Sequence, residues 1–141
     1  MALLVDTSVW SLAYRRDAPP EVPEVAALRA ALAGGDAVVT TGIILLELLR
    51  GFVPDRAQQM IRDDLGVLEA VEPRWADYEA AAGLSTTCRR HGVQLAAVDA
   101  LLAQLAIAHD LTLLTTDHDF AHAARHIPLR VWIAGPHAGP A

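Results

Sequence analysis

The sequence predicts an α/β fold in which a short central parallel sheet is covered by helices on both faces. Three short apolar runs support this prediction, at Ala2–Val5, at Ala37–Thr40 and at residues 111–114. Each run is continuous, whereas a strand with one face in water would alternate polar and apolar residues. Segments with helical periodicity separate the runs; from Val98 to Leu105, for example, apolar residues recur three and four positions apart. A chain of 141 residues is expected to form one such domain.

Glycine and proline mark most boundaries between the expected elements. Pro23 lies near the start of one helix and Gly34 ends it, while Gly51 and Gly92 end two others. In chain order we expect a strand at 2–5, a turn into a helix at 7–14, a proline loop at 19–23, a helix at 23–33, a strand at 37–40, helices at 43–50 and 55–65, a strand at 67–71, helices at 73–90 and 98–105, and strands at 111–114 and 129–133. The expected domain covers residues 1–133, and residues 134–141 are expected to be a flexible tail.

Composition excludes several classes of protein. No apolar run approaches the ~18 residues of a membrane span, and the N-terminus has no basic region, so we expect a cytoplasmic protein without a signal peptide. All basic residues are arginine, and the absence of lysine excludes a P-loop and Schiff-base chemistry. Cys88 is the only cysteine and is expected to be buried and unreactive. The net charge of −6 weighs against broad nucleic-acid binding unless bound cations offset part of it.

Four acidic residues, Asp6, Glu47, Asp99 and Asp117, lie where apolar segments end or turn over. Buried carboxylates are rare unless they are paired or bind a metal. Asp6 and Asp117 each follow an expected strand, so both should lie in the crevice beyond the carboxyl ends of the sheet, where ligands of parallel sheets bind. The set therefore suggests one shared site.

Each acid also has a purely structural interpretation. These are a helix N-cap for Asp6, a first-turn acid for Asp99, a turn residue for Asp117 or Asp119, and an ion pair between Glu47 and Arg50. The structural interpretation is weakest for Glu47, because its helix is apolar on nearly every side and its carboxylate is expected to be buried. A shared site explains the four acids together, whereas the structural interpretations are independent of one another.

Clustered carboxylates are suited to a divalent cation. Their oxygens are the ligands that Mg²⁺ and Mn²⁺ prefer, and neither Cys nor His is needed. Two unit charges ~4 Å apart repel by about 4 kcal/mol at an effective dielectric of ~20, and a cation relieves that repulsion. Such a cation can activate water and stabilise charge on a phosphate. The acids therefore favour phosphodiester hydrolysis over acyl transfer.

The chain resembles the PIN-domain ribonucleases, in particular the VapC toxins of bacterial toxin–antitoxin pairs. Four segments carry the resemblance, in the family's order and at compatible spacings: Leu-Val-Asp-Thr-Ser-Val-Trp at 4–10, Glu-Leu-Leu-Arg-Gly at 47–51, Val-Asp-Ala-Leu-Leu-Ala at 98–103 and Leu-Leu-Thr-Thr-Asp-His-Asp-Phe at 113–120. The resemblance covers nearly the whole chain. It implies a three-layer α/β/α fold and Mg²⁺- or Mn²⁺-dependent cleavage of RNA by a nuclease domain at 1–133.

The resemblance also implies roles for individual residues. Asp6, Glu47, Asp99 and Asp117 correspond to the catalytic acids of the family. Asp6, Asp99 and Asp117 would hold the metal, with Asp119 sharing or replacing the role of Asp117, and Glu47 would orient or deprotonate the attacking water. The remaining expected contributors are supporting residues, Thr7, Ser8 and Thr116, and arginines that contact the RNA backbone, Arg15, Arg16 and Arg50, with Arg89 and Arg90 as further candidates.

The family further implies partners. These are an RNA substrate, with transfer RNA as the first expectation, and a cognate antitoxin that holds the enzyme inactive. A homodimer or a toxin–antitoxin hetero-oligomer is expected, with no membrane association. Cleavage of such an RNA would inhibit translation.

Two other functions compete with this one. His118, His122 and His126 are four residues apart and would share one helix face, so a zinc-dependent hydrolase is a second enzymatic interpretation. A degenerate domain that only binds a protein partner is the non-enzymatic alternative. For Trp10, burial is expected in preference to stacking on a base.

Overall fold

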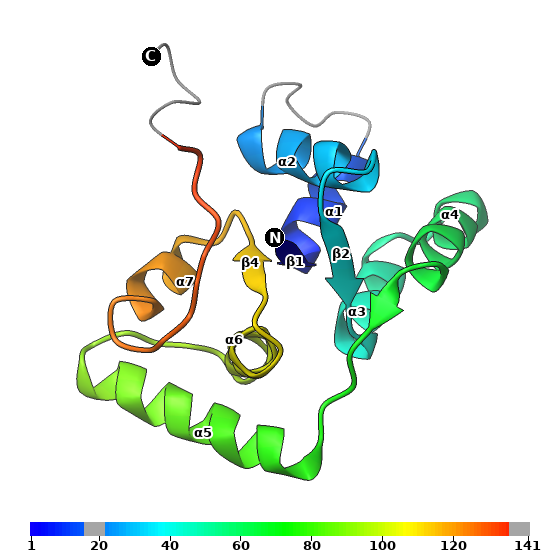
Figure 1. Ribbon diagram of the computed structural model, residues 1–141. Helices are drawn as coiled ribbons and strands as arrows, with labels where there is room; N and C mark the ends of the chain where they lie inside the picture. The colour runs from blue at the N-terminus through cyan, green and yellow to red at the C-terminus, as the bar shows by residue number, and fades with distance from the viewer. Residues whose placement is uncertain (16–21, 136–141) are drawn as a thin grey trace.

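Four short parallel strands form the sheet of this computed structural model, which describes residues 1–15 and 22–135. The strands are β1 (Ala2–Val5), β2 (Ala37–Thr40), β3 (Glu69–Ala70) and β4 (Thr112–Leu114). They lie in the order β3-β2-β1-β4, and every pairing is parallel. The helices of the described residues, arranged around the strands in Figure 1, are α1 (Thr7–Tyr14), α2 (Pro23–Leu32), α3 (Gly42–Gly51), α4 (Asp55–Gly66), α5 (Trp75–Arg90), α6 (Ala97–Ala108) and α7 (His118–Ala123).

Strand β1 lies at the centre of the fold. Its residues Leu3, Leu4 and Val5 are at most 1% exposed. Successive side chains of a strand point to opposite faces of the sheet, so both faces must be covered. Helix α1 packs against α2 and α3, and α3 packs against α4, whereas α5 packs along α6 (Figure 1). The predicted three-layer α/β/α arrangement is therefore confirmed.

The strand order reverses at β1. The chain continues from β1 to β2 on one side, and β4 pairs with β1 on the other. In open parallel sheets, the ligand crevice lies beyond the carboxyl ends of the strands at such a reversal. The backbone N–H of Asp6 donates to the carbonyl of Leu114 at 2.9 Å, which joins the two chain segments where β1 and β4 end.

Helix α6 is fixed to α5 through Asp77, a buried carboxylate. Its Oδ2 accepts from the backbone N–H of Arg74 at 2.8 Å, and its Oδ1 accepts from Nε2 of Gln104 at 3.2 Å. The hydrogen bond from Arg74, and to a lesser degree that from Gln104, lowers the pKa of the Asp77 carboxyl group. Because α6 carries Asp99 in its first turn, this contact helps to set the position of that residue.

Two predicted strands differ from the structure. The one expected at 67–71 is confined to Glu69–Ala70. The one expected at 129–133 is wrong, because only Val131 forms a bridge, and its partner is Leu113. That bridge consists of Leu113 N–H donating to the carbonyl of Arg130 and Trp132 N–H donating to the carbonyl of Leu113. Strand β4 ends one residue later, so the segment has no longer edge to pair with.

Some sequence predictions lie outside the described residues. They are Arg16, most of the proline loop at 19–23, and the tail beyond Gly135. Helix α7 adds an element to those predicted, immediately after the last acidic motif. Across residues 1–15 and 22–135, no helix combines the length and hydrophobicity required to cross a membrane.

Candidate active site

Five acidic side chains come from segments around the carboxyl ends of β1 and β4. Asp6 directly follows β1, and Asp117 is the N-cap of α7, shortly after β4. Asp119 lies in the first turn of α7, Asp99 in the first turn of α6, and Glu47 in α3. Asp6 is buried, Asp119 is exposed and the other three are half-buried. The topology thus brings together the four acids singled out in the sequence and the alternative acid of the last motif.

These carboxylates are close enough to influence one another, as Asp99 shows. Burial raises the pKa of Asp99, and the charges of Asp6, Asp117, Glu47 and Asp119, in decreasing order, raise it further to about 6. Both causes act by disfavouring the ionised carboxylate. Asp99 therefore lies within the electrostatic influence of all four other acids.

Asp6 is held by two hydroxyl groups on a single oxygen. Its Oδ2 accepts from Oγ of Ser8 at 2.8 Å and from Oγ1 of Thr115 at 2.8 Å. Asp6 occupies the N-cap position of α1, yet its side chain makes no capping hydrogen bond. The capping interpretation therefore does not apply to its carboxylate. Within the described residues, Oδ1 accepts no hydrogen bond and is free for a ligand.

The two hydroxyl groups are oriented by backbone amides. The N–H of Thr116 donates to Oγ of Ser8 at 3.2 Å, and the N–H of Asp117 donates to Oγ1 of Thr115 at 3.0 Å. Each hydroxyl oxygen thus accepts from the backbone while its hydrogen is directed to Asp6. Thr116, expected among the supporting residues, contributes its backbone, whereas the hydroxyl that contacts Asp6 belongs to its neighbour Thr115.

Sequence reasoning missed Thr115, although one signal was available. The residue follows the apolar run of β4 and is 6% exposed. A buried hydroxyl group requires a hydrogen-bonding partner. The nearest strand end in a parallel sheet is that of the neighbouring strand, and there Asp6 is the polar residue.

Glu47 is held by a hydroxyl group from α1. Oγ1 of Thr7 donates to Oε1 of Glu47 at 2.8 Å. The carboxylate is half-buried rather than buried, because one side of α3 is open to solvent, where Leu46 is 53% exposed and Arg50 is exposed. The ion pairs of the described residues join Met1 to Asp36 and Arg130 to Asp110, so a Glu47–Arg50 pair is absent there.

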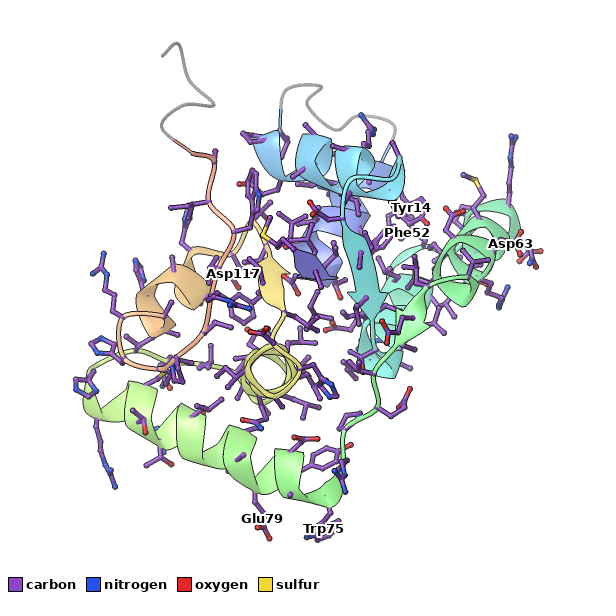
Figure 2. The ribbon with its side chains drawn as sticks, in the orientation of Figure 1. Tyr14, Phe52, Asp63, Trp75, Glu79 and Asp117 are labelled. Atoms are coloured by element: carbon purple, nitrogen blue, oxygen red, sulfur yellow. The ribbon has the colours of Figure 1, made fainter. Side chains whose placement is uncertain are left out.

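Asp117 caps a helix and also lies among the acids of the candidate site. Its Oδ1 accepts from the backbone N–H of Asp119 at 2.9 Å and so caps α7. Figure 2 shows Asp117 between β4 and α7, whereas Asp63 and Glu79 project outward from α4 and α5. Asp119 lies on the exposed side of the same turn.

The donor chemistry of the cluster fits Mg²⁺ or Mn²⁺. All five side chains offer hard carboxylate oxygens, and none of them belongs to the ion pairs found within the described residues. In the part of the chain that the structure describes, no three Asp, Glu, His or Cys side chains form a group arranged to hold a metal ion. Like charges that repel one another are expected to stand apart in this way.

The three histidines do not form the helix face required for a zinc site. Helix α7 ends at Ala123, so His126 lies beyond it, and its ring stacks on His91 with centroids 4.2 Å apart. His118 and His122 are exposed. The structure therefore gives no support to the zinc interpretation.

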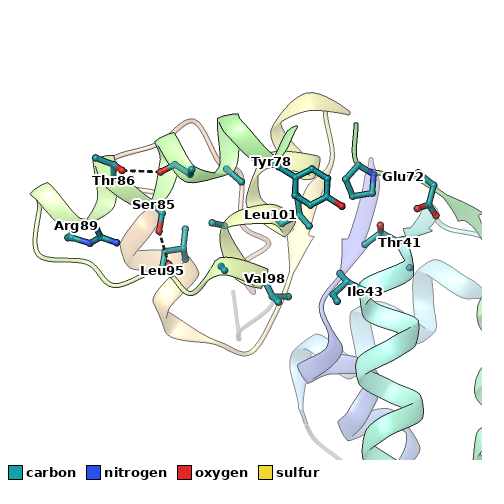
Figure 3. Close-up of a pocket in the computed structure, with 16 residues that line it drawn as sticks. Thr41, Ile43, Glu72, Tyr78, Ser85, Thr86, Arg89, Leu95, Val98 and Leu101 are labelled. Atoms are coloured by element: carbon teal, nitrogen blue, oxygen red, sulfur yellow. Dashed lines mark hydrogen bonds between the residues drawn. The ribbon is translucent and has the colours of Figure 1, made fainter. Parts of the chain in front are cut away.

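The structure also gives the burial of Trp10 and the exposure of the candidate RNA-binding arginines that it describes. Trp10 is 3% exposed and stacks against Tyr14 at 6.1 Å, so the expectation of burial is confirmed. Arg15 and Arg50 are exposed. Arg89 lines a separate cavity of about 860 Å³ between α5, α6 and the start of α3, which none of the five acids lines (Figure 3).

Comparisons with known proteins agree with this geometry. Residues 3–126 match the family described as the PIN domain. Ribonuclease VapC11 of Mycobacterium tuberculosis is 30% identical over 125 residues, which cover 87% of this chain and 92% of that protein. The crystal structure of VapBC2 from Rickettsia felis bound to a promoter DNA fragment has a TM-score of 0.72 at 21% identity, with 94% of this chain and 98% of that chain covered. VapC20 of M. tuberculosis, a Sarcin-Ricin loop cleaving toxin, has a TM-score of 0.65 at 20% identity over 91% of this chain and 98% of that chain. At such identities the two solved structures show a shared fold, and the family match and the curated relative together show that this chain belongs to the PIN-domain family, among the VapC ribonucleases.

Proposed function

We propose that this protein is a Mg²⁺- or Mn²⁺-dependent endoribonuclease that acts as the toxin of a type II toxin–antitoxin pair. The observation that carries the proposal is the convergence of five acids on the carboxyl ends of β1 and β4, where burial and the charges of the other four raise the pKa of Asp99. A cluster of this kind is costly for the fold, and a divalent cation would offset that cost. We assign the nuclease to residues 1–133.

The acids divide into two roles. Asp6 and Asp99, with Asp117 or Asp119, would hold the metal directly or through water. The bound metal would supply a Lewis acid that neutralises the scissile phosphate. Glu47 would orient the attacking water and accept its proton, because Thr7 fixes one of its oxygens and leaves the other available.

The supporting residues keep the acids in position. Ser8 and Thr115 hold one oxygen of Asp6, and the other oxygen would be available to hold the metal. The backbone N–H of Thr116 orients Ser8. Arg15 and Arg50, both exposed, are suited to contacts with the RNA backbone.

Relatives suggest the partners. Several solved neighbours are VapBC assemblies, so we propose a cognate antitoxin as partner and a homodimer or toxin–antitoxin hetero-oligomer as the assembly. The proposed substrate is a structured cytoplasmic RNA, with transfer RNA first, whose cleavage would stop translation. VapC20 is named for cleaving the sarcin-ricin loop, which makes ribosomal RNA the next substrate to test.

A cleavage assay with total RNA tests this function. Wild-type protein is expected to cut RNA with Mg²⁺ or Mn²⁺ and to be silent in excess EDTA. Asp99→Asn should abolish cleavage without unfolding the protein, whereas Glu79→Gln, which changes an exposed acid of α5 outside the cluster, should cut normally. Undiminished cleavage by Asp99→Asn, or by wild type in EDTA, would contradict the proposal.

Two further measurements would identify the substrate and test the toxin function. Mapping the cut sites in total RNA, with Asp99→Asn as the background, would identify the substrate. Expression is expected to arrest growth, and coexpression of the neighbouring small gene to restore it. A protein that binds such a partner but cuts no RNA with either metal would be the degenerate binding module instead.

A further inference from the structure

We propose that a cavity beside the acids binds a nucleobase of the RNA next to the cut, with Trp132 as its stacking platform; this rests on the ribonuclease function proposed above. The cavity measures about 520 Å³, within the ~300–1,000 Å³ usual for small-ligand sites. Thr115, Thr116 and Asp117 contribute to its lining. The cavity is therefore continuous with the acidic cluster, and a nucleotide joined to the scissile phosphate would reach it.

The other walls are mostly apolar and come from separate parts of the fold. Leu12 belongs to α1, Val22 precedes α2, Ala121 belongs to α7, and Val131 and Ile133 flank Trp132. Ile133 is 72% exposed, so apolar surface remains open at this wall. Walls of this kind suit the flat, apolar face of a base.

Trp132 is well placed to stack. Its backbone N–H donates to the carbonyl of Leu113 at 2.8 Å, and its neighbour Val131 bridges to the same residue. The backbone that carries the aromatic ring is therefore fixed to the edge of the sheet. Trp132 is only half-buried. Of the other tryptophans, Trp10 is buried and Trp75 projects from the start of α5 (Figure 2), and neither lines the cavity.

Charge favours a base over a phosphate in this cavity. Among the described residues its lining contains the acids Asp117 and Glu24, the imidazole of His118 and no arginine, and the chain has no lysine. The two carboxylates outnumber the single imidazole and would repel an anionic phosphate, whereas a neutral base can donate hydrogen bonds to carboxylate and hydroxyl oxygens at the rim. Stacking on an aromatic side chain tolerates every base, because each base has a π face.

Abasic substitution in the RNA tests the subsite. A short RNA that spans the mapped cut site would be made with one base deleted at each position in turn. For wild type, deletion of one base beside the cut should lower kcat/KM by about 5- to 100-fold, as expected for one stacked base. In Trp132→Leu, which keeps an apolar wall without the ring, the intact RNA should lose the same factor and the deletion should cost nothing more.

Control variants separate stacking from folding. Trp132→Phe should keep the abasic penalty, and Trp75→Ala, which removes a tryptophan that is 83% exposed, should match wild type. A binding readout without chemistry comes from the intact RNA in EDTA, which should quench tryptophan fluorescence in Trp75→Phe but not in Trp75→Phe combined with Trp132→Leu.

The outcomes distinguish the two proposals. If wild type cleaves RNA but Trp132→Leu retains the full abasic penalty, or if no position carries a penalty, the subsite is refuted and the nuclease stands. If Trp132→Leu leaves RNA cleavage intact and weakens antitoxin binding, the cavity takes a protein side chain and the base proposal fails. If wild type cuts no RNA, both proposals fall.

Discussion

Replacing Asp99 by Asn should stabilise the metal-free protein while it removes activity. The substitution keeps the size and shape of the side chain and removes a charge that burial and four neighbouring acids disfavour. Wild-type protein in EDTA bears the full repulsion of the cluster. The variant should therefore unfold at a higher temperature near neutral pH.

The magnitude follows from the pKa of Asp99. Its rise from 3.8 to about 6 corresponds to ~3 kcal/mol at about 1.36 kcal/mol per pKa unit. Asp99 is only half-buried, and screening by solvent reduces this to about 1–2 kcal/mol. For a domain of this size the expected gain in Tm is about 3–6 °C.

The effect has a defined pH dependence. Because the folded-state pKa lies above the unfolded one, the native protein binds the proton more tightly between pH ~4 and ~6. Wild-type stability should thus fall as pH rises through this window. The advantage of Asp99→Asn should be complete above pH ~6 and should vanish below pH ~4.

Thermal unfolding followed by circular dichroism in EDTA tests this at both ends of the window. Glu79→Gln, an exposed acid outside the cluster, is the control and should not change Tm. Adding Mg²⁺ should raise the Tm of wild type and not that of Asp99→Asn, because only the protein that binds the ion is stabilised. An equal or lower Tm for Asp99→Asn at high pH would refute the reasoning, and a gain independent of pH would show that charge is not its cause.

Three further outcomes are expected. Thr115→Val removes one of the two hydroxyl groups that donate to Asp6. Mn²⁺ affinity measured by calorimetry should therefore fall by about 10-fold, as for the loss of a hydrogen bond to a charged group. Thr115→Ser should restore the affinity, and an unchanged affinity in Thr115→Val would show that Thr115 does not position Asp6. Asp77→Ala should cost about 1 kcal/mol in urea unfolding at neutral pH by removing the hydrogen bond from Arg74 at the start of α5. Because the pKa of Asp77 is lowered, this loss should shrink as pH falls below ~4, and a pH-independent loss would contradict it. Cys88, whose burial raises the pKa of its thiol, should resist thiol reagents until the protein unfolds; rapid labelling of native protein would show that the helix opens.

The parts of the fold that were predictable are those whose sequence pattern is local. Strands β1 and β2 match their predicted bounds, because continuous apolar runs leave few alternatives for buried segments. The segment at 129–133 is apolar except for Arg130, yet it forms a single bridge at Val131. Whether such a segment becomes a strand depends on the length of its partner, here a β4 of three residues, and no local pattern encodes that.

In the site, too, features set by local sequence could be predicted, whereas features set by tertiary contacts could not. Asp6 and Asp117 could be placed at one crevice because strand ends in a parallel sheet coincide. The hydroxyl of Thr115 could not be assigned, because its contact with Asp6 is a tertiary one. The burial of Glu47 was overestimated, since the apolar character of neighbours such as Leu46 does not guarantee that they are covered.

The hydrogen bond between Thr115 and Asp6 has a consequence for synthesis of the protein. It joins residues 109 positions apart in the chain. Contacts of such separation form only after the intervening loop has closed. A chain still emerging from the ribosome contains Asp6 early but lacks Thr115 until 109 further residues have been added. An unfinished copy that lacks β4 therefore holds an incomplete set of acids and cannot assemble the site.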